Sequence, residues 1–257
     1  MLSKNKIKFI RSLEQKKFRR QEGAFVAEGH KTVGDLLNEG FEPLLLVHTD
    51  EWETPVDLPQ RTEKITVSDE ELKKASLLAH PQQVIGVFRL PTEKDFSLEN
   101  IARKELILYL DGVQDPGNLG TIIRTADWFG IKHVVCSQLT ADAFAPKVVQ
   151  ATMGSIARVS IHYADILSTL RNMPHDTPIY GTFLDGQNIY NESLQSHGII
   201  VMGNEGNGIS DEVAQYVTHR LTVPSFHIGS SRAESLNVSI ATAIVCSEFR
   251  RQNVKLS

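Results

Sequence analysis

The chain has 257 residues, of which 41% are hydrophobic and 23% are charged, and its formal net charge at pH 7 is −4. These values are typical of a globular protein long enough for two domains, and they exclude a chain that is polycationic throughout. No apolar run approaches the roughly 20 residues of a membrane-spanning helix, and the polar N-terminal residues do not resemble a signal peptide, so we expect a cytoplasmic protein without membrane contact.

Residues 1–20 form the most basic stretch of the chain. Their apolar residues are spaced as on a helix, which predicts one helix over residues 3–20. The stretch contains one acid, Glu14, and eight basic side chains: Lys4, Lys6, Lys8, Arg11, Lys16, Lys17, Arg19 and Arg20. Local positive charge on an acidic chain indicates binding to a polyanion such as RNA, and a solvated helix face explains it equally well.

Residues 1–92 are predicted to form a small α/β domain. Apolar runs predict strands at residues 24–27, 43–47, 64–67 and 83–88, with helices at residues 29–38 and 68–78. The second helix opens with a capping box, in which Ser68 is followed three residues later by Glu71. The polar, weakly patterned residues 93–104 are predicted to be a linker.

Residues 105–257 are predicted to form a second domain. Strands are expected at residues 105–110, 132–136, 157–162, 178–183, 198–202 and 220–223, and helices at residues 119–129, 145–153, 164–171, 211–217 and 234–250. This alternation predicts a parallel sheet with helices on both faces. The side of the last helix that should pack on the sheet consists of Leu236, Ile240, Ala243, Ile244 and Ser247.

The two cysteines of the chain, Cys136 and Cys246, lie in apolar surroundings of this second domain. They fit buried free thiols in a reducing compartment. No spacing of Cys, His and acidic residues indicates a metal site.

Three polar, glycine-bearing loops each follow a predicted strand of the second domain. They contain the sequences DGVQDPGNLGTIIRTA (residues 111–126), VMGNEGNGIS (201–210) and VPSFHIGSSRAESLNVS (223–239). Open α/β sheets bind ligands at the carboxyl ends of their strands. The loops therefore predict one composite site, although its members are far apart in sequence.

Each loop contains groups suited to binding, and each also has a purely structural explanation. In the first loop, Asn118 is placed to cap a helix, and Arg124 near the start of that helix could bind a phosphate. In the second, Glu205 lies among glycines and could orient an arginine or accept hydrogen bonds from a ligand. In the third, Ser235, Asn237 and Ser239 offer polar groups on the first turn of a helix, which they could simply cap. The glycine spacings match neither a dinucleotide-binding loop nor a Walker loop.

In this order, the three loops resemble the signature motifs of the SpoU (TrmH-like) family of RNA ribose 2′-O-methyltransferases in the SPOUT superfamily. The resemblance covers residues 105–250. Residues 4–13 and 23–30 are similar to the small α/β substrate-binding domain that often precedes this catalytic domain.

The resemblance implies a fold and a cofactor for the second domain. The C-terminal segment would thread through a loop to form a deep trefoil knot, an exception to the usual unknotted topology. S-adenosyl-L-methionine would bind in the knot, at the positions of Gly203, Asn204, Val223 and Leu236. Arg124 stands at the family's catalytic arginine, and the supporting positions are Asn118, Glu205, Ser235 and Asn237. The family acts as homodimers formed through this domain.

These positions suggest a mechanism. Arg124 would act on the ribose hydroxyl and its neighbouring phosphate and stabilise the developing alkoxide, while Asn118 and Glu205 would fix the guanidinium and the ribose. The basic N-terminal helix would bind RNA phosphates. The two-domain layout favours ribosomal RNA over transfer RNA as the substrate.

Three alternatives stay open at this point. The chain could methylate the ribose of transfer RNA, or it could be a non-catalytic knotted protein that only binds RNA. It could also be a nucleotide-binding metabolic enzyme, which predicts binding of NAD or ATP and no affinity for RNA. The presence of all five residues at the catalytic and supporting positions favours an RNA methyltransferase.

Overall fold

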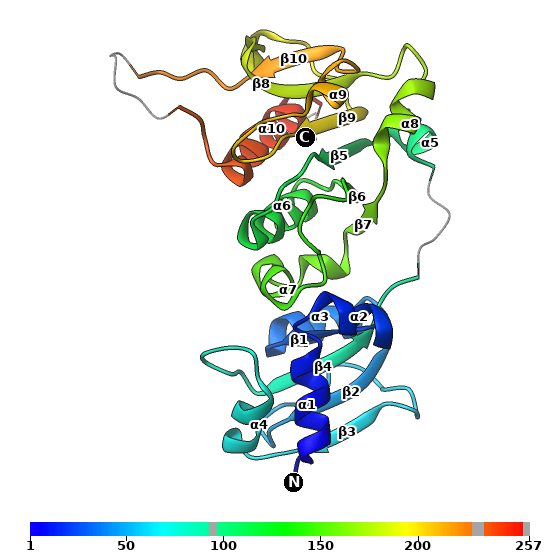
Figure 1. The fold of residues 1–257 in the computed structure, drawn as a ribbon, viewed down its shortest axis with the longest axis vertical. Coiled ribbons are helices and arrows are strands. Elements are labelled where there is room, and N and C mark those ends of the chain that lie inside the picture. Colours follow the sequence, from blue (N-terminus) through cyan, green and yellow to red (C-terminus); the bar gives the residue numbers. More distant parts are fainter. Residues whose placement is uncertain (93–96, 228–233, 254–257) are drawn as a thin grey trace. The chain divides into compact units, whose positions relative to one another are not determined.

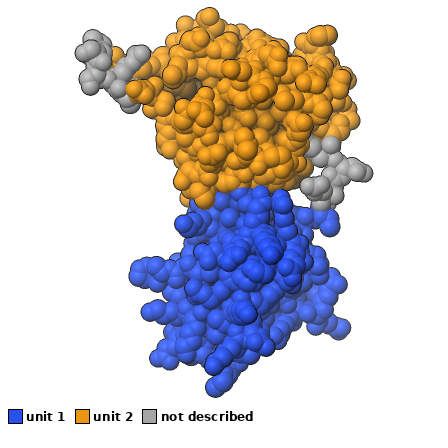
Figure 2. Space-filling view, in the orientation of Figure 1, with its two compact units in different colours: residues 1–92, 142–158 blue, residues 93–141, 159–257 orange. Residues whose placement is uncertain are grey.

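The computed structural model describes residues 1–92, 97–227 and 234–253. The chain forms two compact units, of which the first contains residues 1–92 and 142–158 and the second contains residues 93–141 and 159–257 (Figure 1 and Figure 2). Among the described residues, no helix has the length and apolar character needed to cross a membrane.

The first unit is built on a mixed sheet of four strands in the order β1-β4-β2-β3. These strands are Ala24–Glu28, Val84–Arg89, Pro43–His48 and Glu63–Thr66, respectively. β4 is antiparallel to β1 and β2, and β2 is parallel to β3. The helices are α1 (Lys4–Ser12), α2 (Lys16–Glu22), α3 (His30–Asn38), α4 (Asp69–Ala75), α7 (Pro146–Thr152) and the short 3₁₀ helix η1 (Ser155–Ala157).

Each face of this sheet has its own hydrophobic core, because side chains alternate between the two faces along a strand. Val26 of β1 belongs to the core that contains Ile10 of α1. Its neighbour Phe25 belongs to the opposite core, with Leu36 of α3 and Val149 of α7. The segment 142–158 therefore completes the core of the first unit, although it lies far from residues 1–92 in sequence.

The single helix predicted over residues 3–20 is wrong, because a turn separates α1 from α2. Arg19 stabilises this break. Its Nη1 donates to the carbonyl oxygens of Leu13 (2.8 Å) and Glu14 (2.7 Å), and its Nη2 donates to the Asp142 carboxylate at 2.6 Å. Arg19 is only 3% exposed, so its predicted role as an RNA contact is also wrong.

The second unit is built on a parallel sheet, as predicted. Its strands follow the order β10-β8-β9-β5-β6-β7. They are His219–Thr222, Ile179–Asn188, Gly198–Met202, Leu106–Leu110, His133–Cys136 and Ser160–Tyr163, respectively. Every pair of neighbouring strands is parallel, so the carboxyl ends of all six lie at one edge of the sheet.

Helices cover both faces of the parallel sheet. One face shares a core with α5 (Leu98–Ala102), α8 (Ile166–Asn172) and α9 (Asp211–Ala214). Ile179 of β8 belongs to this core, so the next residue, Tyr180, points to the other face. There Phe249 of α10 (Val238–Asn253) meets Tyr180 edge to face, with ring centroids 4.8 Å apart. α10 also packs on α6 (Pro116–Trp128), and a short 3₁₀ helix, η2 (Ile189–Asn191), follows β8.

The helices α5, α6 and α10 differ from the predictions. α6 begins at Pro116, because Asp115 is its N-cap and accepts a hydrogen bond from the Asn118 N–H at 2.7 Å, so the predicted cap at Asn118 is wrong. α5 lies within the residues predicted to be a linker, where one short turn of helix has too weak a periodicity to be recognised. The last helix begins at Val238, which leaves Ser235 and Asn237 before it.

The predicted inner side of the last helix is also wrong. Ile240 is 52% exposed, and the helix buries another side, which includes Val238, Thr242, Val245 and Phe249. Thr242 can be buried because its hydroxyl donates to the Val238 carbonyl oxygen at 2.7 Å. Because a polar residue such as Thr242 can be buried in this way, a prediction based on apolar residues alone assigned the wrong side of the helix to the core.

The two cysteines are buried and free, as predicted. Burial raises the pKa of the Cys136 thiol and raises that of Cys246 to about 12. Both thiols are therefore protonated at neutral pH and inert as nucleophiles.

The role of Arg19 can be tested through the stability of the first unit. We expect Arg19→Met to lower the free energy of unfolding by about 2–4 kcal/mol, because it leaves buried carbonyl oxygens and the Asp142 carboxylate without their donor. Arg20→Met, at the exposed neighbouring position, should change it by less than about 0.5 kcal/mol. Chemical denaturation measures both, and equal stability of the two variants would contradict the structural role of Arg19.

Candidate functional site

The three glycine-bearing loops meet at the carboxyl edge of the parallel sheet, as predicted. A chain of side-chain hydrogen bonds joins them. Asn118 Nδ2, from the first loop, donates to Glu205 Oε1 of the second loop at 3.1 Å. Asn237 Nδ2, from the third loop, donates to Asn118 Oδ1 at 2.9 Å. We call Glu205, Asn118 and Asn237 the junction.

The hydrogen bonds of the junction fix the orientation of the Asn118 amide. Its nitrogen faces a carboxylate, which can only accept, and its oxygen faces the amide nitrogen of Asn237, which can only donate. Reversing the amide would break both bonds. The junction therefore specifies one arrangement of the three loops.

The Glu205 carboxylate also holds the start of α6. It accepts hydrogen bonds from the backbone N–H groups of Gln114 and Asp115, each at 3.3 Å. Burial disfavours the ionised carboxylate, but the hydrogen bonds from the backbone and from Asn118 outweigh this effect and lower the pKa of Glu205 below its ordinary value of 4.5. Glu205 is therefore an anion at neutral pH.

The second loop is shaped by Asn204. Its Nδ2 donates to the Gly112 carbonyl oxygen of the first loop at 2.7 Å, and its Oδ1 accepts from the N–H groups of Gly206 (2.8 Å) and Asn207 (3.1 Å). Because these bonds occupy both ends of the side chain, Asn204 acts as a brace within the protein. A Cβ atom at Gly203 would overlap the backbone of Gly208 and the next residue, so only glycine permits this close turn.

The third loop leads into α10 through Asn237. The Oδ1 of Asn237 accepts hydrogen bonds from the N–H groups of Ser239 (2.9 Å) and Ile240 (3.4 Å) and from the Ser239 hydroxyl (2.6 Å). Asn237 therefore caps α10, which confirms the structural explanation of this residue. Its Nδ2 is still free to bind Asn118, and one side chain thus ties the start of α10 to the junction.

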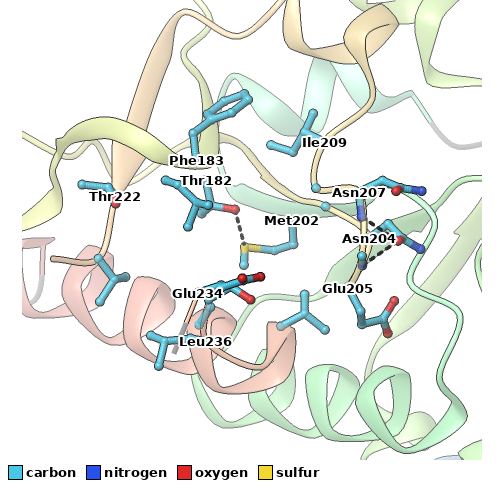
Figure 3. Close-up of a pocket in the computed structure, with 18 residues that line it drawn as sticks. Thr182, Phe183, Met202, Asn204, Glu205, Asn207, Ile209, Thr222, Glu234 and Leu236 are labelled. Atoms are coloured by element: carbon cyan, nitrogen blue, oxygen red, sulfur yellow. Dashed lines mark hydrogen bonds between the residues drawn. The ribbon is translucent and has the colours of Figure 1, made fainter. Parts of the chain in front are cut away.

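A pocket of about 460 Å³ lies beside the junction (Figure 3). Its described lining comprises Thr182, Phe183, Leu184, Met202, residues 203–209, Thr222, Val223, Glu234, Ser235, Leu236, Val238 and Ala241. All four predicted cofactor positions line this pocket, together with Glu205 and Ser235. Asn118, Asn237 and Arg124 do not.

Arg124 lies on α6 with its side chain exposed to solvent. Its guanidinium makes no hydrogen bond or ion pair with any residue that the structure describes. Glu205 and Asn118 bind each other and the loop backbone, so neither holds the guanidinium in place here, in contrast to the predicted arrangement.

Sequence reasoning missed the contribution of β8 to the pocket. Thr182 and Phe183 lie on this strand, and the Thr182 hydroxyl points to the sulfur of Met202 at 3.8 Å (Figure 3). Glu234, just before the Ser-Leu-Asn core, was also missed. The same rule that identified the three loops, that ligands bind at the carboxyl ends of strands, could have identified residues at the end of the strand predicted at 178–183.

The basic residues of the N-terminal segment have different environments in the first unit. Lys6 forms an ion pair with Glu63 at 2.5 Å, and Arg11 donates to the carbonyl oxygen of Ser76 at 3.1 Å. The exposed basic side chains of this segment are Lys4, Lys8, Arg11, Lys16, Lys17 and Arg20. Their role in RNA binding stays a prediction. Among the described residues, no group of three or more His, Cys, Asp or Glu could hold a metal ion.

Comparison with known proteins identifies relatives of both parts of the chain. A model of the SpoU rRNA Methylase family matches residues 105–247, and a model of the MRM3-like substrate binding domain matches residues 4–86. The 23S rRNA (guanosine(2553)-2′-O)-methyltransferase RlmP of Bacillus subtilis (strain 168) is 33% identical over 248 residues, which cover 95% of this chain and 96% of the relative.

Solved structures show the same architecture over almost the whole chain. A Porphyromonas gingivalis protein assigned to the TrmH family of RNA methyltransferases is 46% identical, with a TM-score of 0.86 and coverage of 98% of this chain and 99% of that one. The AdoMet-bound rRNA methyltransferase of Sinorhizobium meliloti is 31% identical, with a TM-score of 0.83 and coverage of 99% and 97%.

The junction makes stability depend on the charge of Glu205. Because folding lowers its pKa below 4.5, ionised Glu205 stabilises the fold above that pH, and the contribution is lost as the pH falls through the folded-state value. We expect Glu205→Gln to be less stable than the wild type at neutral pH, with a difference that shrinks on acidification. Denaturant unfolding across this range measures it, with Glu212→Gln, an exposed acid on α9, as the control. A difference independent of pH would contradict the assignment.

Proposed function

Because the chain belongs to the SpoU rRNA methylase family, we propose that it transfers the methyl group of S-adenosylmethionine to a ribose 2′-hydroxyl of ribosomal RNA. The observation that carries this proposal is the junction, which joins the three family motifs beside one pocket. The Bacillus subtilis relative, which matches along nearly its whole length, supports ribosomal RNA over transfer RNA as the substrate.

The pocket fits the cofactor in size and chemistry. Its volume of about 460 Å³ lies within the range of small-ligand sites. Apolar side chains such as Met202 and Leu236 can pack on flat or aliphatic parts of a ligand, Ser235 can hydrogen-bond its polar groups, and Glu234 can attract its positive charge. When bound there, the sulfonium of S-adenosylmethionine supplies an activated methyl group. The AdoMet-bound relative supports this choice of cofactor.

The residues at the junction hold the site together, and Arg124 remains available to the substrate. Asn118, Glu205 and Asn237 fix the three loops and therefore the walls of the pocket. Arg124 lies on the same helix as Asn118, exposed and without a partner among the described residues. We assign its guanidinium to the RNA phosphate beside the reacting ribose and to the charge that develops on the 2′-oxygen. Ser235, in the pocket wall, is placed to hold the cofactor.

The division of labour in the chain follows from these assignments. Residues 1–92 would bind the RNA substrate and residues 105–257 would form the methyltransferase domain, although residues 142–158 pack in the first unit and α5, within the predicted linker 93–104, packs in the second. The match of residues 4–86 to a substrate-binding domain supports the first assignment. Exposed Lys4, Lys8, Lys17 and Arg20 supply positive charge for phosphates. The buried, protonated thiols of Cys136 and Cys246 are compatible with the reducing cytoplasm, where we place the protein.

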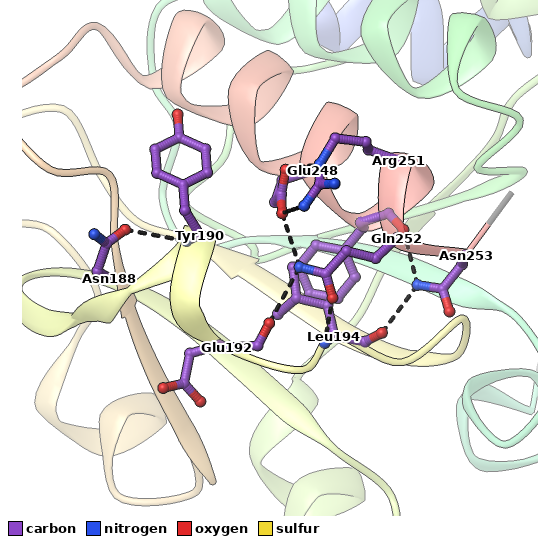
Figure 4. A network of polar contacts seen from close by, with 9 residues as sticks. Asn188, Tyr190, Glu192, Leu194, Glu248, Arg251, Gln252 and Asn253 are labelled. Atoms are coloured by element: carbon purple, nitrogen blue, oxygen red, sulfur yellow. Dashed lines mark hydrogen bonds and ion pairs between the residues drawn. The ribbon is translucent and has the colours of Figure 1, made fainter.

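We also propose that the C-terminal segment forms the trefoil knot of this superfamily. Its contacts with the connection between β8 and β9 support this topology (Figure 4). The Leu194 N–H donates to Gln252 Oε1 at 2.9 Å, Gln252 Nε2 donates to the Glu192 carbonyl oxygen at 3.1 Å, and Asn253 Nδ2 donates to the Leu194 carbonyl oxygen at 3.0 Å. Glu248, which pairs with Arg251 at 2.6 Å, also accepts from Gln252 at 2.7 Å.

A homodimer would cover apolar side chains that the single chain leaves in water. Trp128 at the end of α6 is 85% exposed, and Ile240 on α10 is about half exposed. The two helices pack side by side, with Trp128 near the end where Arg250 donates to the Phe129 carbonyl oxygen and Ile240 near the end where Asn237 donates to Asn118, so an interface that covers both residues runs along the helix pair. Large exposed apolar residues on adjacent elements are typical of a protein interface.

The activity can be tested with purified protein and with RNA from a deletion strain. We expect calorimetry to detect S-adenosylmethionine binding, and ribose-methylation mapping to show one ribosomal RNA position that loses its 2′-O-methyl group in the deletion strain. Tight RNA binding without cofactor binding would instead identify a non-catalytic RNA-binding protein. Loss of methylation on a transfer RNA alone would overturn the assigned substrate.

The role of Arg124 predicts a specific kinetic defect. Arg124→Lys keeps the positive charge but loses the planar fork of donors, so we expect single-turnover methylation to slow by about tenfold or more with cofactor affinity unchanged. Arg103→Lys, at an exposed position of the same unit, serves as the control and should retain the wild-type rate. A normal rate for Arg124→Lys would exclude an arginine-specific role.

The proposed dimer predicts a change in mass. We expect the wild type to have the mass of two chains in light scattering, and Trp128→Glu to become monomeric while it stays folded, because a charge at the interface core is costly to bury. Leu139→Glu, at another exposed apolar position, should remain dimeric. A wild-type monomer, or a dimeric Trp128→Glu, would exclude this interface.

A further inference from the structure

The pocket in the second unit has an uneven charge distribution. Its described lining contains two carboxylates, Glu205 and Glu234, and no Lys or Arg. Arg220 lies outside this lining, 3.5 Å from the centroid of the Phe183 ring, and pairs with Asp185 at 2.7 Å. That ion pair offsets its charge. The described walls of the pocket are therefore anionic.

The two carboxylates of the pocket have different surroundings. Glu205 is committed to the junction, and in Figure 3 its carboxylate points towards α6. The Glu234 carboxylate points into the pocket in the same view, in the region of Met202. It forms no hydrogen bond or ion pair with any residue that the structure describes. A carboxylate that lines a pocket and has no partner among the described residues is suited to interact with a cationic ligand.

The methyl donor and the product of the proposed reaction differ in charge. S-adenosylmethionine carries a sulfonium in addition to its ammonium and carboxylate, so it has one net positive charge. The S-adenosylhomocysteine that remains after transfer has lost the sulfonium charge and is neutral overall. An anionic pocket thus attracts the donor more strongly than the product, and the difference weakens with salt because the site is open to solvent.

We propose that Glu234 is a specificity-determining residue that makes the pocket prefer the cationic methyl donor to its neutral product. This inference rests on the proposed function. Glu234 is not part of the junction and lies outside the Ser-Leu-Asn core. We therefore assign it an electrostatic effect on the ligand and no role in holding the loops. It favours binding of a fresh cofactor and release of the spent one after each transfer.

The experiment compares the affinities of both ligands for the wild type, for Glu234→Gln and for the control Glu212→Gln. Calorimetry at low and at moderate salt gives the dissociation constants of S-adenosylmethionine and S-adenosylhomocysteine. We expect Glu234→Gln to reduce the preference for the donor by about five- to tenfold, mainly through weaker donor binding. The wild-type preference should fall as salt is added, and the control should keep the wild-type ratio.

The outcomes separate this inference from the function on which it rests. A reduced ratio with near-normal product affinity supports Glu234 as the residue that senses the sulfonium charge. An equal loss for both ligands overturns the inference, because Glu234 would then bind the ammonium that both ligands share. No loss for either ligand also overturns it, because Glu234 would then have no ligand group as a partner. If the wild type binds neither ligand, the proposed methyltransferase function itself fails.

Discussion

The hydrogen bonds of the junction are the interaction on which the site depends. Asn118 and Glu205 are 87 residues apart in sequence, and Asn118 and Asn237 are 119 apart, yet all three side chains meet. The parallel sheet makes this possible, because the carboxyl ends of β5 and β9 lie at one edge. The sheet brings the loops close, and the amide of Asn118, with one acceptor and one donor engaged, selects their arrangement.

The junction separates the structural and the chemical tasks of the family motifs. Glu205, Asn204 and Asn237 engage mainly protein groups, so their polarity is used to shape loops that contain several glycines. Arg124 and Glu234 have no partner among the described residues, and they are the groups left for ligands. We propose that the guanidinium recognises RNA and that the carboxylate recognises the charge of the methyl donor. The two functions lie on different segments but depend on the same scaffold.

The amino-acid sequence was sufficient to predict the elements of the fold that have strong local patterns. Alternating strands and helices predicted the parallel sheet, and the polar loops predicted a composite site. Other features depend on contacts that are remote in sequence. Arg19 was predicted to be an exposed cation, but it is buried and donates hydrogen bonds to Asp142 and to two backbone carbonyl oxygens at the end of α1. Ile240 was predicted to be a core residue, but Thr242 lies on the buried side of α10 instead, because its hydroxyl forms a hydrogen bond within the helix. Asn118 was predicted to cap α6, but Asp115 is the N-cap and accepts a hydrogen bond from the Asn118 N–H.

The most direct test of this account measures cofactor binding in variants outside the pocket. Neither Asn118 nor Asn237 lines the pocket, so each affects the cofactor through the loops that it positions, Asn118 through the junction and Asn237 through the junction and the start of α10. Calorimetry should show that Asn118→Ala and Asn237→Ala each weaken S-adenosylmethionine binding by about tenfold, and that the double variant loses clearly less than the sum of the two single losses, because both break the same link. Wild-type affinity in either variant, or losses that simply add, would contradict the claim that the junction holds the three loops around the pocket.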